Sequence, residues 1–139
     1  DVTPKSMLRF GWFWGKFNSK DYTVIWSVLL PNRMMKNPIL VVNERNASYF
    51  AIPQKDIWFS TGDIHWSHLI PVPFFYHIGT MIPSVLLIVD MEVVDADYKP
   101  LMGTMHYWRF HVRCSGTIFA GDYAETIDDV FIAEYIRFR

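Results

Sequence analysis

Apolar residues along this chain occur in short runs or alternate with polar residues, and the spacing typical of an amphipathic helix is nearly absent. Turn residues such as Pro31-Asn32, Gly62-Asp63 and Gly121-Asp122 separate the apolar stretches. The stretches predict β-strands at residues 8–17, 22–30, 39–43, 48–52, 57–60, 84–94, 103–114, 116–120 and 130–138. Because the connections are short, we expect an all-β, antiparallel sheet with meander topology, and closure into a barrel would remove its exposed edges.

The two most aromatic stretches, residues 10–17 and 22–28, are predicted to form a β-hairpin. A turn with Ser19 and Lys20 at its tip would pair Asn18 with Asp21 and place Trp14 opposite Ile25. One face then mixes large rings with polar groups, as a ligand-lining surface does, and carries Trp12, Trp14, Lys16, Thr23, Ile25 and Ser27. The other face is apolar and carries Phe13, Phe17, Tyr22, Val24, Trp26 and Val28. Neither face is polar enough to meet water, so we expect both to be covered, by the core and by either a ligand or a partner.

The later strands place charged residues on defined faces. In residues 103–114, one face is predicted to carry Met105, Tyr107, Arg109, His111 and Arg113, and it is either a solvated exterior or the polar wall of a pocket. In residues 130–138, Glu134 is the only charge in an apolar row. A carboxylate in such a row must be paired, protonated or hydrated. Glu134 is therefore either a pocket acid or half of a structural ion pair with Arg109 or Arg113.

Residues 69–89 form a stretch without a formal charge that is long enough to span a bilayer. Pro71, Pro73 and Pro83 would interrupt a helix there, so we expect no membrane span. Residues 69–83 are instead expected to form an apolar loop that covers a pocket or packs against a neighbour.

Length and composition narrow the classes of partner. With 139 residues, the chain is expected to fold as a single domain. The formal net charge is -1 and no basic cluster is present, which argues against nucleic acid as a partner. Aromatic residues make up 17% of the chain, which favours binding of an apolar or aromatic small molecule or of a large partner surface.

Other motifs carry less weight. Cys114 is expected to be a buried, unreactive thiol, because it lies in a predicted strand. Asn46-Ala47-Ser48 is an N-glycosylation sequon in a polar turn, which is compatible with a secreted protein and leaves a cytoplasmic one open. His65 and His68 have no evident third ligand nearby, so we expect no metal site, and no motif for a cofactor is present. The acidic residues Asp122, Glu125, Asp128 and Asp129 are expected to form a solvated loop.

The hairpin residues Trp12-Phe13-Trp14-Gly15-Lys16-Phe17 and Asp21-Tyr22-Thr23-Val24-Ile25-Trp26 resemble a W-x-W-G motif followed by Y-T-x-V. This motif belongs to the lipocalin-like family of carotenoid 1,2-hydratase and AttH, which includes fungal Diels-Alderases and kievitone-hydratase-like proteins. Tyr107-Trp108-Arg109-Phe110, Gly116 and Glu134-Tyr135-Ile136 are similar to the closing strands of the family. The resemblance implies a lipocalin-like β-barrel that corresponds to the C-terminal half of a two-domain protein. It therefore implies a second β domain as the covering partner, with a homodimer as the alternative.

Three functions follow as hypotheses. The first is an enzyme, a pericyclase of the Diels-Alder or hetero-Diels-Alder type in natural-product biosynthesis, which acts by orienting its substrate and polarising a carbonyl. The expected binding residues are Trp12, Trp14, Tyr107, Trp108 and Tyr123, and the expected polarising groups are Lys16, Arg109, His65 or Tyr123. The second is a hydratase or cyclase in which Glu134, or less favourably Asp63, protonates an alkene. The third is a protein that binds an apolar small molecule, or assembles through its aromatic faces, without catalysis.

Overall fold

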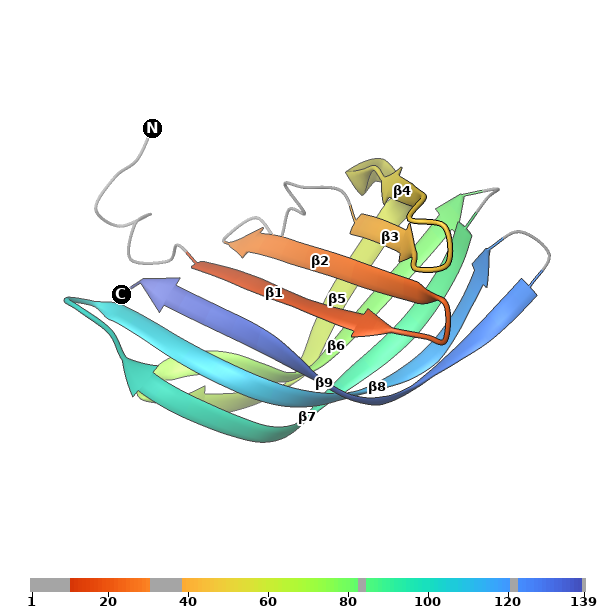
Figure 1. Ribbon diagram of the computed structural model, residues 1–139. Coiled ribbons are helices and arrows are strands. Elements are labelled where there is room, and N and C mark those ends of the chain that lie inside the picture. Colours follow the sequence, from red (N-terminus) through yellow and green to blue (C-terminus); the bar gives the residue numbers. More distant parts are fainter. Residues whose placement is uncertain (1–10, 31–38, 83–84, 121–122, 139) are drawn as a thin grey trace.

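A computed structural model describes residues 11–30, 39–82, 85–120 and 123–138 of the chain, and within these residues all the strands belong to one antiparallel sheet (Figure 1). The strands are β1 (Gly11–Asn18), β2 (Tyr22–Leu30), β3 (Ile39–Asn43), β4 (Tyr49–Ile52), β5 (Ile57–Ser67), β6 (Ile70–Ile82), β7 (Val85–Pro100), β8 (Met105–Ala120) and β9 (Tyr123–Phe138). A short 3₁₀ helix, η1 (Gln54–Asp56), connects β4 to β5.

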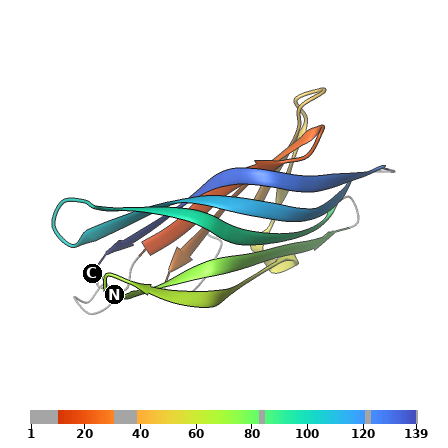
Figure 2. The ribbon, with the colours of Figure 1, turned by 90° about the horizontal axis from the view of Figure 1, so that it is seen from below.

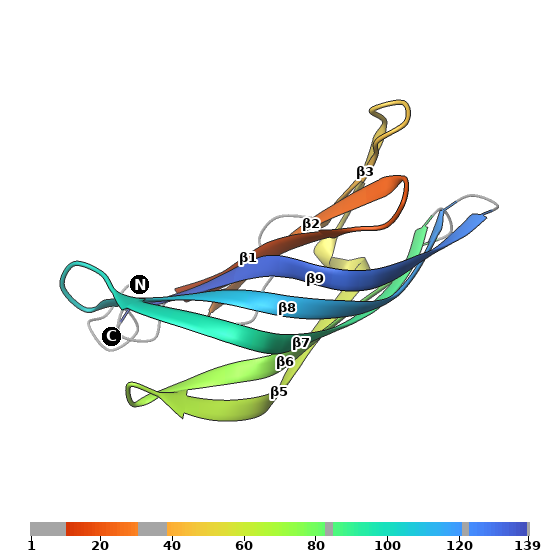
Figure 3. The ribbon, with the colours of Figure 1, turned by 60° about the horizontal axis from the view of Figure 1, so that its bottom comes forward.

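The order of the strands across the sheet is β4-β3-β2-β1-β9-β8-β7-β6-β5. Neighbouring strands are consecutive in the chain except for β1 and β9, so the meander prediction is confirmed. The sheet curls into a half-barrel, and its curvature can be followed in Figures 2 and 3, which view the molecule from below. The expected all-β, antiparallel, lipocalin-like barrel fold is therefore confirmed, with β4 and β5 as the two edges of the sheet.

The predicted loop at residues 69–83 is wrong, because most of it forms strand β6. Pro71 and Pro73 pair with β5, opposite Trp66 and Ile64, while the pairing of β6 with β7 begins only at Phe75. The proline segment thus has a neighbour on one side only. Proline lacks an N–H donor, and this is tolerated at such a position, as it is in edge strands. The sequence pattern alone did not reveal that the segment is unpaired on one side.

Other boundaries also differ from the prediction: β5 and β7 extend beyond their predicted ends, through Gly62-Asp63 and through residues 95–97, which were expected to be turns. Residues 103–114 and 116–120 form the single strand β8, because Gly116 continues the ladder instead of making a turn. A side chain at Gly116 would collide with the backbone oxygen of Ile88 on β7, so the two strands pack at a distance that only glycine permits. The expected acidic loop is wrong for Glu125, Asp128 and Asp129, which lie in β9. Asp122 lies outside the described residues.

The predicted register of the β1–β2 hairpin is wrong, because Trp14 pairs with Ser27 and Lys16 pairs with Ile25. The turn is wider than expected: Asn18 pairs with Thr23, and the Ser19 amide donates a hydrogen bond of 2.9 Å to the carbonyl of Tyr22. A two-residue hairpin turn favours residues with positive φ, usually glycine or asparagine, and the sequence offers Ser and Lys instead. Since the register shifts by an even number of residues, the two predicted faces survive.

The core lies on the concave face of the sheet. Alternate residues of β1 and β2, including Phe13, Phe17, Val24, Trp26 and Val28, are buried there, as are alternate residues of β6 to β9. Cys114 is buried on β8, as predicted. The opposite face of β1, with Trp14 and Lys16, is exposed.

Candidate functional site

A cluster of aromatic rings covers the concave face. Phe13 of β1 stacks on Tyr135 of β9 with ring centroids 4.2 Å apart, and Trp108 of β8 stacks on the same tyrosine at 5.2 Å. Tyr76 of β6 meets the edge of Phe13 at 5.1 Å. These strands alternate buried and exposed positions, so each one contributes its ring to the same side of the sheet. The result is a wall of aromatic surface that is compatible with an apolar ligand.

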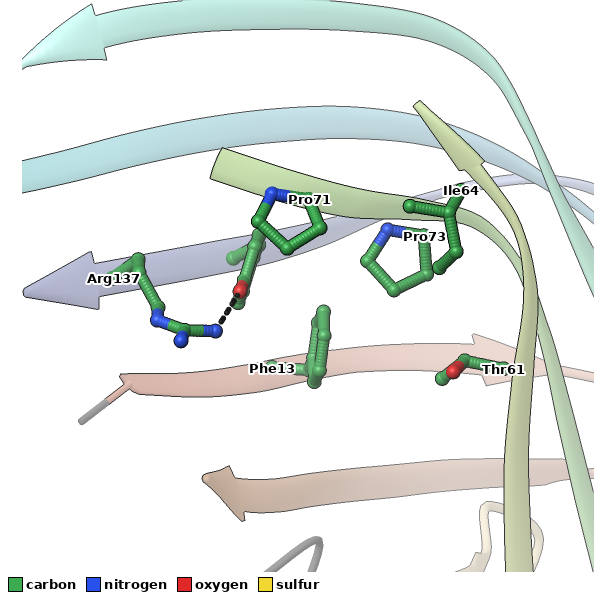
Figure 4. A pocket seen from close by; sticks show the side chains of 7 residues that line it. Phe13, Thr61, Ile64, Pro71, Pro73 and Arg137 are labelled. Atoms are coloured by element: carbon green, nitrogen blue, oxygen red, sulfur yellow. Dashed lines mark hydrogen bonds between the residues drawn. The ribbon is translucent and has the colours of Figure 1, made fainter. Parts of the chain in front are cut away.

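A cavity of about 140 Å³ opens beside this cluster (Figure 4). It lies between β1, β5, β6 and β9, and its lining consists of Phe13, Thr61, Ile64, Pro71, Pro73, Tyr135 and Arg137. A dry cavity of about 150 Å³ is enough to bind benzene in a well-studied case. The cavity therefore has room for one ring or a similar fragment of a larger molecule.

Two polar side chains stand next to each other at the cavity. Nη1 of Arg137 donates a hydrogen bond of 2.9 Å to Oη of Tyr135. Burial raises the pKa of Tyr135 above its usual value, although the charge and hydrogen bond of Arg137 act in the opposite direction. The tyrosine is thus a neutral hydroxyl near neutral pH, and the guanidinium keeps further N–H donors beyond the one bound to Tyr135.

The proline wall of the cavity is held in place by Tyr76. Its buried hydroxyl donates a hydrogen bond of 2.8 Å to the carbonyl of Pro73, and burial raises its pKa well above the usual range. Since the β6 segment at Pro71 and Pro73 lacks pairing to β7, this bond ties it to the aromatic cluster instead. The cavity is therefore formed by a fixed surface rather than by a loose loop.

Most of the residues predicted for the site lie together, but on the outer face of the sheet. In the register, Trp14 pairs with Glu134 and Glu134 pairs with Arg109, so the three form one row across β1, β9 and β8. A second row contains Trp12, Ile136 and Tyr107. Lys16 is exposed on the same face of β1.

Tyr107 and Glu134 interact within this outer group. Burial, followed by hydrogen bonding and the charge of Glu134, raises the pKa of Tyr107 to about 12. Glu134 thus has Tyr107 and Arg109 as neighbours, and it does not line the cavity on the concave face. Both alternatives for Glu134, a pocket acid and a partner of an arginine, therefore concern the outer face of the sheet and not the cavity.

The remaining predicted residues are dispersed. Trp108 belongs to the inner cluster, where its indole Nε1 donates a hydrogen bond of 3.0 Å to Oγ of Ser67. His65 is exposed on β5, stacks on Phe74 at 4.0 Å and lies 3.2 Å from Oδ1 of Asp63. Tyr123 is exposed at the opposite end of the sheet.

Tyr123 borders a second, more polar cleft of about 600 Å³, between the β1–β2 turn, the β3–β4 turn and the start of β9. Lys20, Asp21 and Arg45 contribute charged groups to this cleft. Asn46 is exposed in the β3–β4 turn, and its Oδ1 accepts hydrogen bonds from both the amide and the hydroxyl of Ser48, at 2.9 and 2.6 Å. The sequon therefore lies on the surface.

Sequence reasoning missed Arg137, Tyr135 and Thr61 as cavity residues and assigned Phe13 to packing alone. A signal for Arg137 was present: Phe131, Ala133, Tyr135 and Arg137 alternate in the sequence, so a cation ends the apolar row that faces the core. The prediction used only the other row of the same strand, which contains Glu134. Thr61 had no such signal, since it lies beyond the predicted end of its strand.

No group of three or more His, Cys, Asp or Glu side chains among the described residues is arranged to hold a metal ion. No helix in that part of the chain has the length and apolar character needed to cross a membrane. Comparisons with protein-family models, with curated proteins and with solved structures found no match to this chain.

Proposed function

We propose that this chain binds an unsaturated small molecule bearing a carbonyl or carboxylate oxygen, and that it accelerates a cycloaddition of the Diels-Alder or hetero-Diels-Alder type. The observation that carries the proposal is the pair of donors, Arg137 and Tyr135, at the edge of a cavity walled by Phe13 and two prolines. The rings and prolines offer apolar surface to the unsaturated part, and the two donors would bind the oxygen.

Such a reaction needs orientation and polarisation rather than a nucleophile. Holding two reacting fragments in alignment can lower the barrier by about 7–11 kcal/mol. A hydrogen bond from Arg137 to the substrate carbonyl would withdraw electron density from the adjacent alkene, and a placed donor of this kind is worth about 3–4 kcal/mol. None of the described residues that line the cavity is acidic, which favours this mechanism over alkene protonation by a carboxylic acid.

A partner domain extends the proposal. Trp14 and Ile132 each expose about two fifths of their surface on the outer face of the sheet, where large apolar side chains are not expected to meet water. We propose that a second β domain of the lipocalin-like kind covers this face, as the resemblance to the carotenoid 1,2-hydratase and Diels-Alderase family implies. A second copy of the chain is the alternative, and sedimentation of the purified chain would distinguish it by a mass twice that of the monomer.

The binding step is tested with cinnamaldehyde as the probe and styrene as its analogue without oxygen. Fluorescence of the tryptophans reports binding, since Trp108 stacks directly on Tyr135. The variant Arg137→Met should weaken binding of cinnamaldehyde by roughly tenfold or more and leave that of styrene unchanged, because a charged hydrogen bond is worth about 1.5–3 kcal/mol. Arg113→Met, on the exposed outer face of β8, is the matched control. Equal binding of both probes by wild type and variant would contradict the assignment.

The catalytic step is tested separately. The purified chain is incubated with a quinone methide and an alkene, and the rate and stereochemistry of the product are compared with those without protein. A faster, stereoselective reaction that Arg137→Met slows would support the pericyclase. If the chain binds cinnamaldehyde but has no effect on the cycloaddition, the enzymatic function is rejected and a function in binding alone is supported.

A further inference from the structure

The tips of two neighbouring hairpins carry large apolar side chains that protrude into solvent. At the β5–β6 tip, Trp66 and Leu69 are 75% and 77% exposed, and at the β7–β8 tip Met102 is 92% exposed. Leu101, beside Met102, is also exposed. A folded domain gains nothing from placing such residues in water, and exposed apolar groups gathered at one place mark interaction sites.

The two tips lie at the same end of the sheet, as Figures 1 and 3 show. His68 of the first tip stacks on Tyr98 of β7 with ring centroids 3.6 Å apart. The hydrogen bond from Trp108 of β8 to Ser67 joins the hairpins a second time. The tips therefore form one connected end of the molecule. The exposed apolar residues of this end are called the tip residues: Trp66, Leu69, Leu101 and Met102.

The backbone at Leu69 adds an independent observation. His68 and Leu69 have φ values of 52° and 64°, in the left-handed region that glycine and asparagine prefer. A leucine there is unfavourable for the turn, and its exposure gives it no compensating burial. Residues kept in such a conformation tend to lie at functional positions.

Charge and shape indicate the partner. Residues 64–74 contain no formal charge, and residues 98–108 contain a single one, that of Lys99. The two segments therefore contain no carboxylate that anionic lipid headgroups would repel, although Asp63 and Asp97 directly precede them in the chain. Side chains on protruding turns can insert into a lipid bilayer, because a fluid bilayer does not need a preformed complementary pocket. Tryptophan also favours the boundary between headgroups and acyl chains.

We propose that the tip residues dock this end of the protein on a lipid bilayer. Insertion to a depth of roughly 5–10 Å, as for other interfacial segments, is enough to bury side chains at the ends of two turns. Trp66 pairs with Pro71, which lines the cavity, so docking brings the cavity next to the bilayer. An apolar ligand could then pass from lipid to cavity, a consequence that rests on the proposed function, whereas docking itself does not.

The test measures binding of the full chain to vesicles without any ligand. Co-sedimentation is recorded with phosphatidylcholine vesicles and with mixed phosphatidylcholine and phosphatidylglycerol vesicles, together with the shift of tryptophan emission. Wild type should sediment with both, and more strongly with the mixed vesicles because of Lys99. Leu69→Gly should weaken binding by about tenfold, since burial of one leucine side chain has about that effect on an equilibrium. Glycine also suits the turn, so this variant should fold at least as well as wild type.

Met81→Ser is the matched control, since Met81 is 66% exposed at the opposite end of β6. It should leave vesicle binding unchanged, while Met102→Ser should reduce it. Failure of wild type to sediment with either vesicle would overturn the proposal, as would equal losses for Met81→Ser and Leu69→Gly. A dimer that Leu69→Gly dissociates, without vesicle binding, would assign the tips to a contact between copies instead. Cinnamaldehyde binding is measured separately, so either proposal can fail alone.

Discussion

Phe13 and Tyr135 stack almost parallel, with an interplanar angle of 13° and centroids 4.2 Å apart, although 122 positions separate them in the sequence. The contact joins β1 to β9, the two strands that pair out of chain order. It therefore stabilises the sheet at its only non-consecutive pairing within the described strands, and it also forms one side of the cavity.

Phe13→Ala should accordingly destabilise the protein by about 3–5 kcal/mol, the range for truncation of a buried phenylalanine. Trp14→Ala, at the next position on the exposed face, should lower the free energy of unfolding far less, because Trp14 is 42% exposed. Urea denaturation followed by circular dichroism measures both. Similar losses for the two variants would mean that the outer face of β1 is buried in solution, for example in a dimer.

Gly116→Ala should prevent folding or lower the unfolding free energy severely. A Cβ there meets the backbone of Ile88 and Val89 on β7, which cannot move without breaking the ladder. Gly62→Ala is the control, since its nearest neighbour would be the Phe75 ring at 3.8 Å, an ordinary contact. Thermal denaturation of the two variants separates them, and a tolerant Gly116→Ala would show that β7 and β8 are further apart than described.

Stability should fall as the pH rises from about 9 to about 12. Burial, and to a lesser extent the charge of Asp129, raises the pKa of Cys114 from 9.0 to about 12, and that of Tyr107 rises from 10.0 to about 12. The unfolded chain therefore loses these protons at lower pH than the folded chain does. Each increase of one pH unit in this window consequently lowers the free energy of unfolding. Urea midpoints across the window measure the slope, which Cys114→Ala and Tyr107→Phe should each reduce. At pH 8, Cys114 should react with a thiol reagent only after denaturation.

Glu125→Gln should loosen the β1–β2 turn. Oε1 of Glu125 accepts hydrogen bonds from the Ser19 hydroxyl at 2.5 Å and from the Asp21 amide at 2.8 Å. Desolvation raises the pKa of Glu125, but these bonds and the charge of Lys20 outweigh it, so the pKa lies below its usual value. Stability from the carboxylate is thus complete above the unfolded pKa and declines as the pH falls through the folded one. We expect a loss of about 1 kcal/mol at pH 7, modest because the site is partly solvated, and a smaller difference near pH 3.

The strand pattern was accessible from the sequence where a strand is paired on both sides. The strands at 22–30 and 39–43 were predicted with the bounds that the structure gives. The prediction for β6 was wrong because of Pro71 and Pro73. A proline disrupts a strand only where a second neighbouring strand needs its N–H group, and whether β7 pairs with this segment is decided by the whole sheet. The break predicted between residues 103–114 and 116–120 is absent, because Gly116 permits close packing against β7, and the sequence alone does not distinguish such a glycine from one that begins a new strand.

The candidate cavity was less accessible for a related reason. Alternation identifies which residues share a face, and the faces of β1, β8 and β9 were predicted correctly, but it does not tell which face is concave. The predicted site was placed on the face of β1 that carries Trp12 and Trp14, which is the outer face of the sheet. Arg137 lies on the inner side, and only the curl of the sheet brings it beside Thr61 and Pro71.

The order of strands also divides the chain into two successive folding units. Strands β1 to β4 pair with one another, and β9 is the one strand outside this group with which they pair in the described sheet. Strands β5 to β9 form a second local meander. The two units are joined by the ladder between residues 11–15 and 133–137, so their union requires contacts between segments distant in the chain, the kind that slow folding. Cleavage at η1, between the units, would break no strand pairing in the described sheet. Two separately produced fragments divided there should therefore recognise each other and reassemble.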